Sequence, residues 1–290
     1  MIYKQWRELS VDPYKIKYKK IKLNNIISYL PAGNDVLECS CDYKDENINL
    51  ILKFERSKMA DFKSELNIIN FLQTTNYSSI VPNIIEDGTI NNKKYLVLEK
   101  KEGRRLSEIF KSKKIKRSKY IYNYGKSLAE FHLLKPNKMF KAKQRIINDI
   151  PKEKDYKIDD NIRIYIKYLN KHKPTIKYDT FIHGDYHYAN LLWKYGKLSG
   201  ILDFEYSGLG FKEQDIAWAI VLRPMQKFMD NSEDIKTFLQ GYLSVNNYNT
   251  DSLKWCLINA YCHFYLMNIN NDEYANKILK LVSNIDKFMI

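Results

Sequence analysis

Two short segments in the second half of the chain carry side chains suited to chemistry on a phosphate group. Residues 181–193 read FIHGDYHYANLLW, and residues 201–205 read ILDFE. Phosphoryl transfer to an alcohol needs a carboxylate that orients the hydroxyl and accepts its proton, and it needs oxygen ligands for the magnesium ion that bridges the phosphates. These groups are supplied by Asp185, by Asn190 after four intervening residues, and by Asp203 at the end of an apolar run.

Each of these side chains also has an ordinary alternative role. A single Asp in a loop is usually solvated or caps a helix. The tripeptide DFE is common in unrelated sequences. It is the order and spacing of Asp185, Asn190 and Asp203 together that favour a catalytic site.

The first half of the chain offers groups that would hold a nucleotide. Lys53 lies in the apolar run LILKFER, and a buried ammonium is costly unless it reaches a partner. Glu65, on the helix expected next, is its natural partner, and the pair would hold the α- and β-phosphates. Exposure of both side chains on surface elements is the alternative. Gly33 and Asn34 lie in a turn at residues 32–35 whose backbone amides could cover phosphates.

The elements expected to position these residues differ between the two parts of the chain. In the first hundred residues, apolar periodicity predicts strands at 36–42 and 49–54, a helix at 57–74, and a hairpin of strands at 83–87 and 95–99. The remainder is mainly helical, with short strands at 197–203 and helices at 120–134, 154–168, 215–222, 233–245 and 253–268.

These elements predict an α+β, bilobal protein. Residues 1–101 would form a small lobe with a mixed β-sheet and one helix, and this lobe would bind the nucleotide. Residues 102–290 would form a larger, mainly helical lobe for catalysis and acceptor binding. No internal repeat is visible.

Composition indicates a folded protein of the cytoplasm. Hydrophobic residues make up 44% of the 290 residues, which is well above the content of a disordered chain. No apolar run is long enough to span a membrane, and the first ten residues lack the apolar core of a secretory signal. The cysteines fit no zinc spacing and are expected to be reduced thiols in the core; they are Cys39, Cys41, Cys256 and Cys262.

The net charge of +14 raises the question of a nucleic-acid partner. Residues 1–140 hold 27 basic and 16 acidic side chains, whereas residues 181–290 hold 10 and 12. The basic excess is densest at residues 111–119, where a solvated helix face explains it, and no nucleic-acid-binding motif accompanies it. We therefore expect neither a nucleic-acid nor a membrane partner.

The HGD-x-x-x-x-N and DFE segments resemble the superfamily of aminoglycoside phosphotransferases and choline and ethanolamine kinases, which has a protein-kinase-like fold. The likeness extends to LVLEKKEGRRL at residues 96–106, to LAEFH at residues 128–132 and to DIA at residues 215–217. It covers about residues 30 to 220 in order. The single glycine of the turn at residues 32–35 departs from the glycine-rich loop of protein kinases.

The resemblance implies a role for each candidate residue. Asp185 would be the catalytic base, and Asn190 and Asp203 would bind Mg²⁺. Lys53 and Glu65 would hold the phosphates of ATP or GTP. The backbone from Glu99 to Lys101 would bind the nucleobase, whereas His183 and Asp215 would support the catalytic loop.

The acceptor implied is a small molecule with a hydroxyl group. Aminoglycosides and amino alcohols are both cationic, which suits the slightly acidic residues 181–290, although neutral and anionic acceptors stay open. Glu205 is the best candidate for contacting a cation, with loop bracing as the alternative. The aromatic candidates for contacting the acceptor are Tyr186, Tyr188, Trp218, Trp255 and Tyr261. Packing in the core is the alternative role for these aromatic side chains.

Three other readings remain at the level of sequence. The protein could be a choline- or ethanolamine-type kinase, or a kinase-like scaffold without activity, although the full set of polar residues argues against the scaffold. A nucleic-acid-binding module rests on charge alone. The sequence leaves open a monomer or a homodimer, and a metabolic, resistance-related or spore-associated role.

Overall fold

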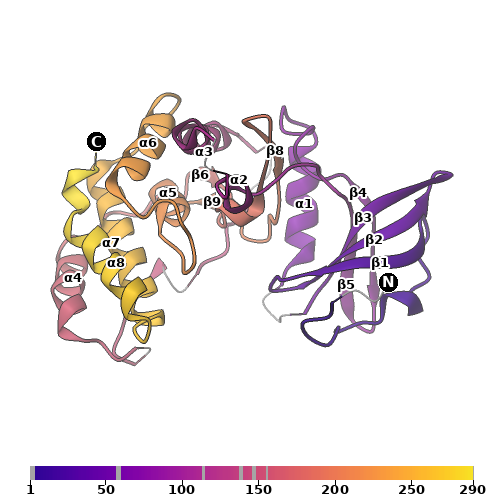
Figure 1. Cartoon of the computed structure of the whole chain (residues 1–290), viewed down its shortest axis with the longest axis horizontal. Coiled ribbons are helices and arrows are strands. Elements are labelled where there is room, and N and C mark those ends of the chain that lie inside the picture. Colours follow the sequence, from indigo (N-terminus) through magenta and orange to yellow (C-terminus); the bar gives the residue numbers. More distant parts are fainter. Residues whose placement is uncertain are drawn as a thin grey trace. The chain divides into compact units, whose positions relative to one another are not determined.

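The structure is a computed structural model that describes residues 4–56, 60–112, 115–136, 140–145, 148–154 and 156–289 (Figure 1). The chain forms two compact units. The first unit comprises Met1–Glu102 with Ser199–Glu205, and the second comprises Gly103–Leu198 with Tyr206–Ile290. The α+β class is confirmed, because the first unit contains an antiparallel sheet and the second is mainly helical.

The first unit is built on a five-stranded sheet with the order β1-β2-β3-β5-β4. Every strand pair in it is antiparallel, where the sequence predicted a mixed sheet. Short turns join β1 to β2, β2 to β3 and β4 to β5, and such turns permit only antiparallel pairing. The strands are β1 (Lys22–Leu30), β2 (Asp35–Tyr43), β3 (Glu46–Phe54), β4 (Ile84–Ile90) and β5 (Lys93–Glu99).

Strand alternation explains where the core of this unit lies. Along β2, Leu37, Cys39 and Cys41 are fully buried and their neighbours are more exposed, as expected for a strand with one face on the core. β1 was not predicted, because register shifts between Leu23 and Asn25 and between Ile26 and Ser28 interrupt its alternation.

The helix of the first unit carries one member of the candidate site. α1 (Phe62–Leu72) begins after Asp61, whose side chain accepts a hydrogen bond from the Ser64 amide. Its buried face includes Glu65 among apolar neighbours. The predicted start at residue 57 lies outside the described residues.

The second unit is mainly helical, with two small two-stranded sheets. Helices lie at or near the predicted positions, although the one predicted from residue 154 begins at Asp160. The structure adds α2 and α8, and in α8 Tyr274, Ile278 and Leu281 recur at helical spacing. Its helices are α2 (Leu106–Ile109), α3 (Arg117–Phe131), α4 (Asp160–Lys171), α5 (Lys212–Ile220), α6 (Ser232–Leu243), α7 (Thr250–Met267) and α8 (Asp272–Ser283). Its short strands are β6 (Thr180–Ile182), β7 (Leu191–Lys194), β8 (Lys197–Ile201), which continues into the first unit, and β9 (Gly208–Gly210).

Two glycines allow α3 and α6 to pack backbone against backbone (Figure 1). A Cβ atom on Gly125 would lie 2.0 Å from the Phe238 carbonyl oxygen, and one on Gly241 would lie 2.0 Å from the Tyr122 carbonyl oxygen. Both distances are far shorter than a van der Waals contact, so only glycine fits at either position.

Two predictions from composition can be compared with the structure. The four cysteines are buried with free thiols, as expected for core residues. Within the described part of the chain, no helix is long and apolar enough to cross a membrane.

Candidate active site

Lys53 lies at the centre of a buried ionic cluster in the first unit. It comes from β3, and its Nζ lies 2.7 Å from Oε2 of Glu65, 2.9 Å from Oδ1 of Asp203 and 3.0 Å from Oε1 of Glu205. The predicted pairing of Lys53 with Glu65 is therefore present. Three carboxylates share one ammonium, which resolves the cost of placing a lysine in a buried strand.

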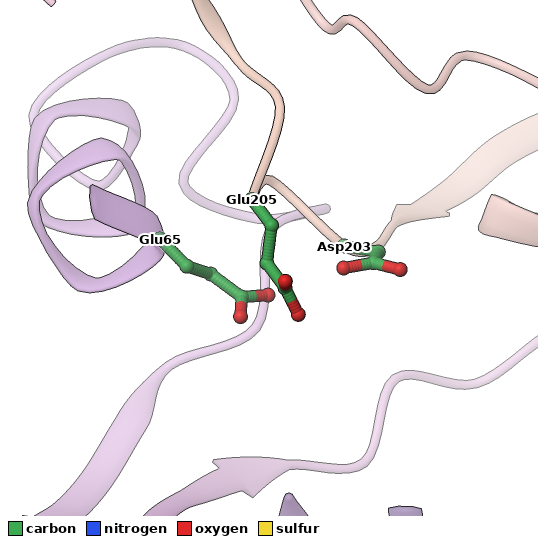
Figure 2. Close-up of side chains that lie close together, drawn as sticks. All are labelled: Glu65, Asp203 and Glu205. Atoms are coloured by element: carbon green, nitrogen blue, oxygen red, sulfur yellow. The ribbon is translucent and has the colours of Figure 1, made fainter. Parts of the chain in front are cut away.

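The three carboxylates of this cluster come from two stretches of the chain. Glu65 projects from α1, whereas Asp203 and Glu205 follow β8, and Figure 2 shows the three side chains converging. One oxygen from each lies within 4.8 Å of the others. Carboxylate oxygens are ligands that a hard divalent cation such as Mg²⁺ prefers, but here all three carboxylates also contact the Lys53 ammonium. Asp203 is the most exposed of the three, at 39% of its side chain, so it is the best placed to reach a ligand.

Burial and mutual charge determine the protonation of this cluster. Burial raises the pKa of Glu65 to about 7; the Lys53 ammonium opposes this shift, and the carboxylates of Asp203 and Glu205 add to it. Burial alone would lower the pKa of Lys53, but Asp203, Glu65 and Glu205 outweigh it and hold that pKa well above its ordinary value. Lys53 therefore stays charged, and Glu65 titrates near neutral pH.

Asp203 is held in an uncommon backbone conformation. Its φ of 67° lies in the left-handed region, which a residue other than glycine seldom adopts. Such conformations persist where the surrounding structure enforces them, often at functional sites. The turn after β8 thus aims Asp203 at Lys53.

The carboxylate of Glu205 lies beside Lys53. The sequence suggested contact with a cationic acceptor, but the carboxylate is only 8% exposed and pairs with Lys53. It also accepts a hydrogen bond from the side chain of Asn34, whose own Oδ1 accepts one from the Arg56 amide. Glu205 and Asn34 therefore belong with the Lys53 cluster, and contact between Glu205 and an acceptor stays a prediction.

The remaining candidates of the first unit lie at the predicted elements. Gly33 is in the turn between β1 and β2, where an added Cβ would meet nothing within 4 Å. Glu99 ends β5, and its backbone amide donates to the Asn83 carbonyl, so this N–H is not offered to a nucleobase. Lys101 forms an ion pair with Glu99 at 3.0 Å. The nucleobase role of residues 99–101 stays a prediction.

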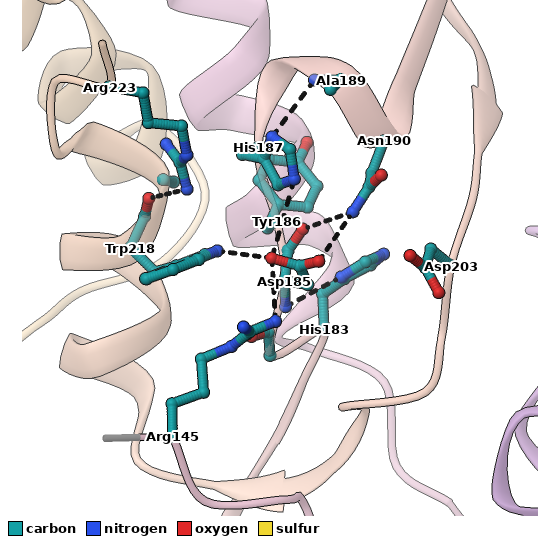
Figure 3. Close-up of polar contacts among 12 residues, drawn as sticks. Arg145, His183, Asp185, Tyr186, His187, Ala189, Asn190, Asp203, Trp218 and Arg223 are labelled. Atoms are coloured by element: carbon teal, nitrogen blue, oxygen red, sulfur yellow. Dashed lines mark hydrogen bonds and ion pairs between the residues drawn. The ribbon is translucent and has the colours of Figure 1, made fainter. Parts of the chain in front are cut away.

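In the second unit, Asp185 is the one carboxylate of residues 181–193, and several polar contacts hold it (Figure 3). Its Oδ1 accepts from Nε1 of Trp218 at 2.8 Å and lies 2.9 Å from Nη2 of Arg145. Nδ2 of Asn190 donates to its Oδ2 at 3.1 Å and to its backbone carbonyl at 3.0 Å. This arrangement fixes the carboxylate, and a carboxylate oxygen can accept more than one hydrogen bond.

The same bonds orient Asn190. Because its amide nitrogen donates twice to Asp185, the carboxamide oxygen is directed away from that residue. A carbonyl oxygen is a suitable ligand for Mg²⁺. This orientation is consistent with Mg²⁺ binding by Asn190, which stays a prediction.

The loop that carries Asp185 is braced from α5. Oδ2 of Asp215 accepts from the His183 amide at 2.9 Å, and Oδ1 accepts from the Gly184 amide at 3.0 Å. Nε2 of His132 lies 3.1 Å from Asp215 as well. Gly184 has a φ of 76°, and a Cβ there would lie 2.3 Å from the Tyr206 carbonyl oxygen. His183 and Asp215 thus have the structural position that the resemblance implied.

The aromatic candidates divide between the core and the loop. Tyr186 is fully buried and stacks on Tyr124 with ring centroids 5.2 Å apart, a core position, and its acceptor contact stays a prediction. Tyr188 is half-buried and packs edge-on against Phe228, and its acceptor role stays a prediction. Trp255 and Tyr261 are buried core residues, the alternative considered for both.

Sequence reasoning missed the part that Arg145 plays at Asp185. Arg145 lies in a stretch without helical or strand periodicity, so nothing in the local pattern distinguishes it from other basic residues. Trp218 was considered only for acceptor contact or packing, and its indole N–H instead donates to Asp185. A long-range contact of this kind leaves no signature in residue spacing.

The second unit also contains a cleft of about 770 Å³ that does not include Asp185. His172, Pro174, Phe211 and Glu213 are among the residues lining it. It contains none of the predicted site residues. The candidate functional residues thus form two polar clusters, one around Lys53 in the first unit and one around Asp185 in the second.

Comparison with known proteins gives a family match and similar solved structures. The sequence matches the phosphotransferase enzyme family over residues 30–255. A thermostable mutant of aminoglycoside phosphotransferase APH(4)-Ia, in a ternary complex with AMP-PNP and hygromycin B, is 12% identical with a TM-score of 0.62, covering 92% of this chain and 95% of that one. The choline kinase LicA from Streptococcus pneumoniae is 13% identical with a TM-score of 0.55, covering 92% and 94%.

A third structure, the streptomycin–ATP–APH(2″)-IIa ternary complex, is 15% identical with a TM-score of 0.54 and covers 89% of this chain and 91% of that one. No protein with a curated description matches this sequence. At such low identity, the solved structures establish the fold, and they confirm that it is protein-kinase-like. The family match spans well over half of the chain, and the chain therefore belongs to the phosphotransferase enzyme family.

Proposed function

We propose that this protein is a small-molecule kinase that transfers the γ-phosphoryl group of ATP to a hydroxyl group. The observation that carries the proposal is the position of Lys53, a buried ammonium shared by Glu65, Asp203 and Glu205. A buried Lys–Glu pair next to a metal-binding Asp is the arrangement that kinases use to grip nucleotide phosphates.

The similar structures support an adenine nucleotide. They were determined with AMP-PNP, with ATP and, in the case of LicA, with AMP. Two of them also hold an aminoglycoside, hygromycin B or streptomycin. These ligands belong to those proteins, and for this chain they support ATP rather than GTP as the donor.

Each cluster would contribute a separate part of the reaction. Lys53 would hold phosphate oxygens of ATP, and Glu65 would keep its ammonium in place. Asp203, with Asn190 as predicted, would hold Mg²⁺, which when bound offsets the negative charge of the phosphates. Asp185 would accept a hydrogen bond from the acceptor hydroxyl at Oδ2 and take its proton as the new P–O bond forms and the bond between the γ-phosphorus and the bridging oxygen breaks, with ADP as the leaving group.

The test is magnesium-dependent formation of ADP from ATP in the presence of a broad panel of hydroxyl compounds, including aminoglycosides, choline, ethanolamine, homoserine and sugars. Asp185→Asn removes the base, so we expect it to lower turnover by about 10²- to 10⁴-fold while AMP-PNP still binds. Asp251→Asn, an exposed change at the start of α7, is the matched control.

The possible results separate an enzyme from a scaffold. Acceptor-stimulated turnover that disappears in Asp185→Asn supports the proposal. A protein that fails to bind AMP-PNP with Mg²⁺ contradicts it and favours a scaffold without activity. Equal turnover by the wild type and Asp185→Asn would remove Asp185 from the mechanism.

A further inference from the structure

Arg145 is held beside Asp185 by four contacts. Its Nη2 lies 2.9 Å from Oδ1 of Asp185, and its Nε donates to the Gly184 carbonyl at 3.0 Å. Its guanidinium carbon lies 3.6 Å from the ring centroid of Tyr206 and 4.5 Å from that of Trp218. Cation–π contacts at such distances stabilise a guanidinium. The position next to Asp185 that an acceptor ammonium would seek is therefore already occupied by a cation.

A second guanidinium, that of Arg223, lies near the same carboxylate. Its carbon is 4.7 Å from the Trp218 ring centroid, and in Figure 3 Arg223 and Arg145 lie on two sides of the Trp218 side chain. No carboxylate in the described part of the chain forms an ion pair with Arg223. The charge of Asp185 acts on Arg223 through space, so one carboxylate faces two guanidinium groups.

Capping of α5 accounts for only part of the role of Arg223. Its Nη2 donates to the Trp218 carbonyl at 2.9 Å and its Nη1 donates to the Val221 carbonyl at 3.2 Å, at the end of that helix. The end of a helix carries about half a negative charge. The two carbonyls engage two of the five N–H donors of the guanidinium, so the positive charge is only partly balanced.

The surroundings of Asp185 are therefore basic rather than acidic. Two acidic residues of this unit, Asp215 and Asp234, form ion pairs with side chains other than Arg145 and Arg223. Asp215 contacts His132, and Asp234 pairs with Arg117.

We propose that Arg223 and Arg145 form an anion-binding subsite, and that the acceptor carries a carboxylate or phosphate group near the hydroxyl that reacts at Asp185. This inference rests on the proposed kinase function and deepens it by naming the acceptor class. The two guanidiniums would attract such a group and repel an ammonium, so the acceptor differs in charge from aminoglycosides and amino alcohols. Guanidinium groups match both anions through paired hydrogen bonds.

The experiment is calorimetric titration of the protein, saturated with AMP-PNP and Mg²⁺, with probes that share a carbon skeleton and differ in charge. One set is glycerol, 2-amino-1,3-propanediol, glycerate and glycerol 3-phosphate. The other is glucose, glucosamine, glucuronate and glucose 6-phosphate. We expect at least one anionic probe to bind on the order of tenfold more tightly than its neutral and cationic counterparts. The carboxylate and phosphate members of each set distinguish the two anions.

The variants Arg223→Gln and Arg145→Gln should abolish this preference, whereas Arg223→Lys and Arg145→Lys should retain part of it. Lys277→Gln on α8 removes one exposed charge elsewhere and is the control. Circular dichroism melts show whether each variant is folded, and the Lys variants keep the test valid if a Gln variant is not.

Several outcomes would overturn the subsite. One is binding of a cationic probe that is as tight as or tighter than that of its anionic counterpart, and another is no binding of any anionic probe at millimolar concentration. The third is weaker binding of AMP-PNP by Arg223→Gln, which would assign this arginine to the nucleotide. If the wild type does not bind AMP-PNP before any probe is added, the proposed kinase function is contradicted, and the subsite is not the cause.

Discussion

At the scale of single residues, the buried ammonium of Lys53 is stabilised by the carboxylates around it. An isolated buried ammonium would lose its hydration without compensation. Here Glu65, Asp203 and Glu205 supply more negative charge than one lysine can neutralise. The cluster is therefore stable only with Lys53 charged, and its surplus negative charge suits a cation.

We predict that Lys53→Met destabilises the protein by about 3–5 kcal/mol at pH 8, because it leaves buried carboxylates without their cation. The loss should be smaller at pH 5.5, since Glu65, whose pKa is already raised to about 7, then carries a proton. The sign follows from linkage: a carboxyl whose pKa is raised in the folded state favours folding at low pH, and this contribution is lost as pH rises from about 4.5 through 7.

Urea denaturation at the two pH values measures this effect. Lys63→Met, an exposed change on the same α1 helix, should alter stability by less than about 0.5 kcal/mol at either pH. Equal destabilisation of Lys53→Met at pH 5.5 and pH 8 would show that Glu65 does not take up the proton.

At the scale of elements, apolar periodicity was sufficient for most of the fold. Strands β2, β3 and β5 and helices α3 to α7 lie where alternation or helical spacing predicted them. β1 was missed because its bulges disturb the alternation. The sequence did not predict that the sheet is fully antiparallel, because the relative direction of two strands depends on the path of the chain that connects them.

The packing of α3 against α6 gives a prediction at this scale. Gly241→Ala should raise intrinsic helix propensity by roughly 1 kcal/mol, yet its Cβ would meet the Tyr122 carbonyl at 2.0 Å. Overpacking of this kind costs about 1–3 kcal/mol, and here the atom in the way is backbone, which cannot rotate aside. We expect net destabilisation.

Thermal unfolding of Gly241→Ala beside Gln240→Ala tests this expectation. Gln240 is exposed on the same helix, so its replacement should be neutral within about 0.5 kcal/mol. A melting temperature for Gly241→Ala equal to or above that of the wild type would mean that α3 and α6 are farther apart than described.

At the scale of the whole molecule, the two units divide the polar residues between them. Lys53, Glu65, Asp203 and Glu205 belong to the first unit because Ser199–Glu205 packs with Met1–Glu102. Asp185 and Asn190 belong to the second. A nucleotide bound by the first unit should therefore stabilise the folded protein as a ligand does.

We predict that AMP-PNP with Mg²⁺ raises the melting temperature, with about 2.7 kcal/mol of stabilisation at a ligand concentration 100 times Kd. Removal of Mg²⁺ with EDTA should reduce this shift. Asp203→Asn, which removes the most exposed carboxylate of the cluster, should make the shift insensitive to EDTA. A shift in the wild type that is equal with and without Mg²⁺ would exclude a metal role for the cluster.

The sequence by itself determined the α+β class, most elements, the buried Lys53–Glu65 pair and the positions of Asp185, Asn190 and Asp203, because all of these follow from local periodicity and short motifs. Only the tertiary structure decided what surrounds them. It buried Glu205 against Lys53, removed Tyr186 to the core, and brought Arg145 and Trp218 to Asp185 from 40 residues before and 33 residues after it. Charges summed along a chain cannot reveal this, because electrostatic interactions depend on distance in space.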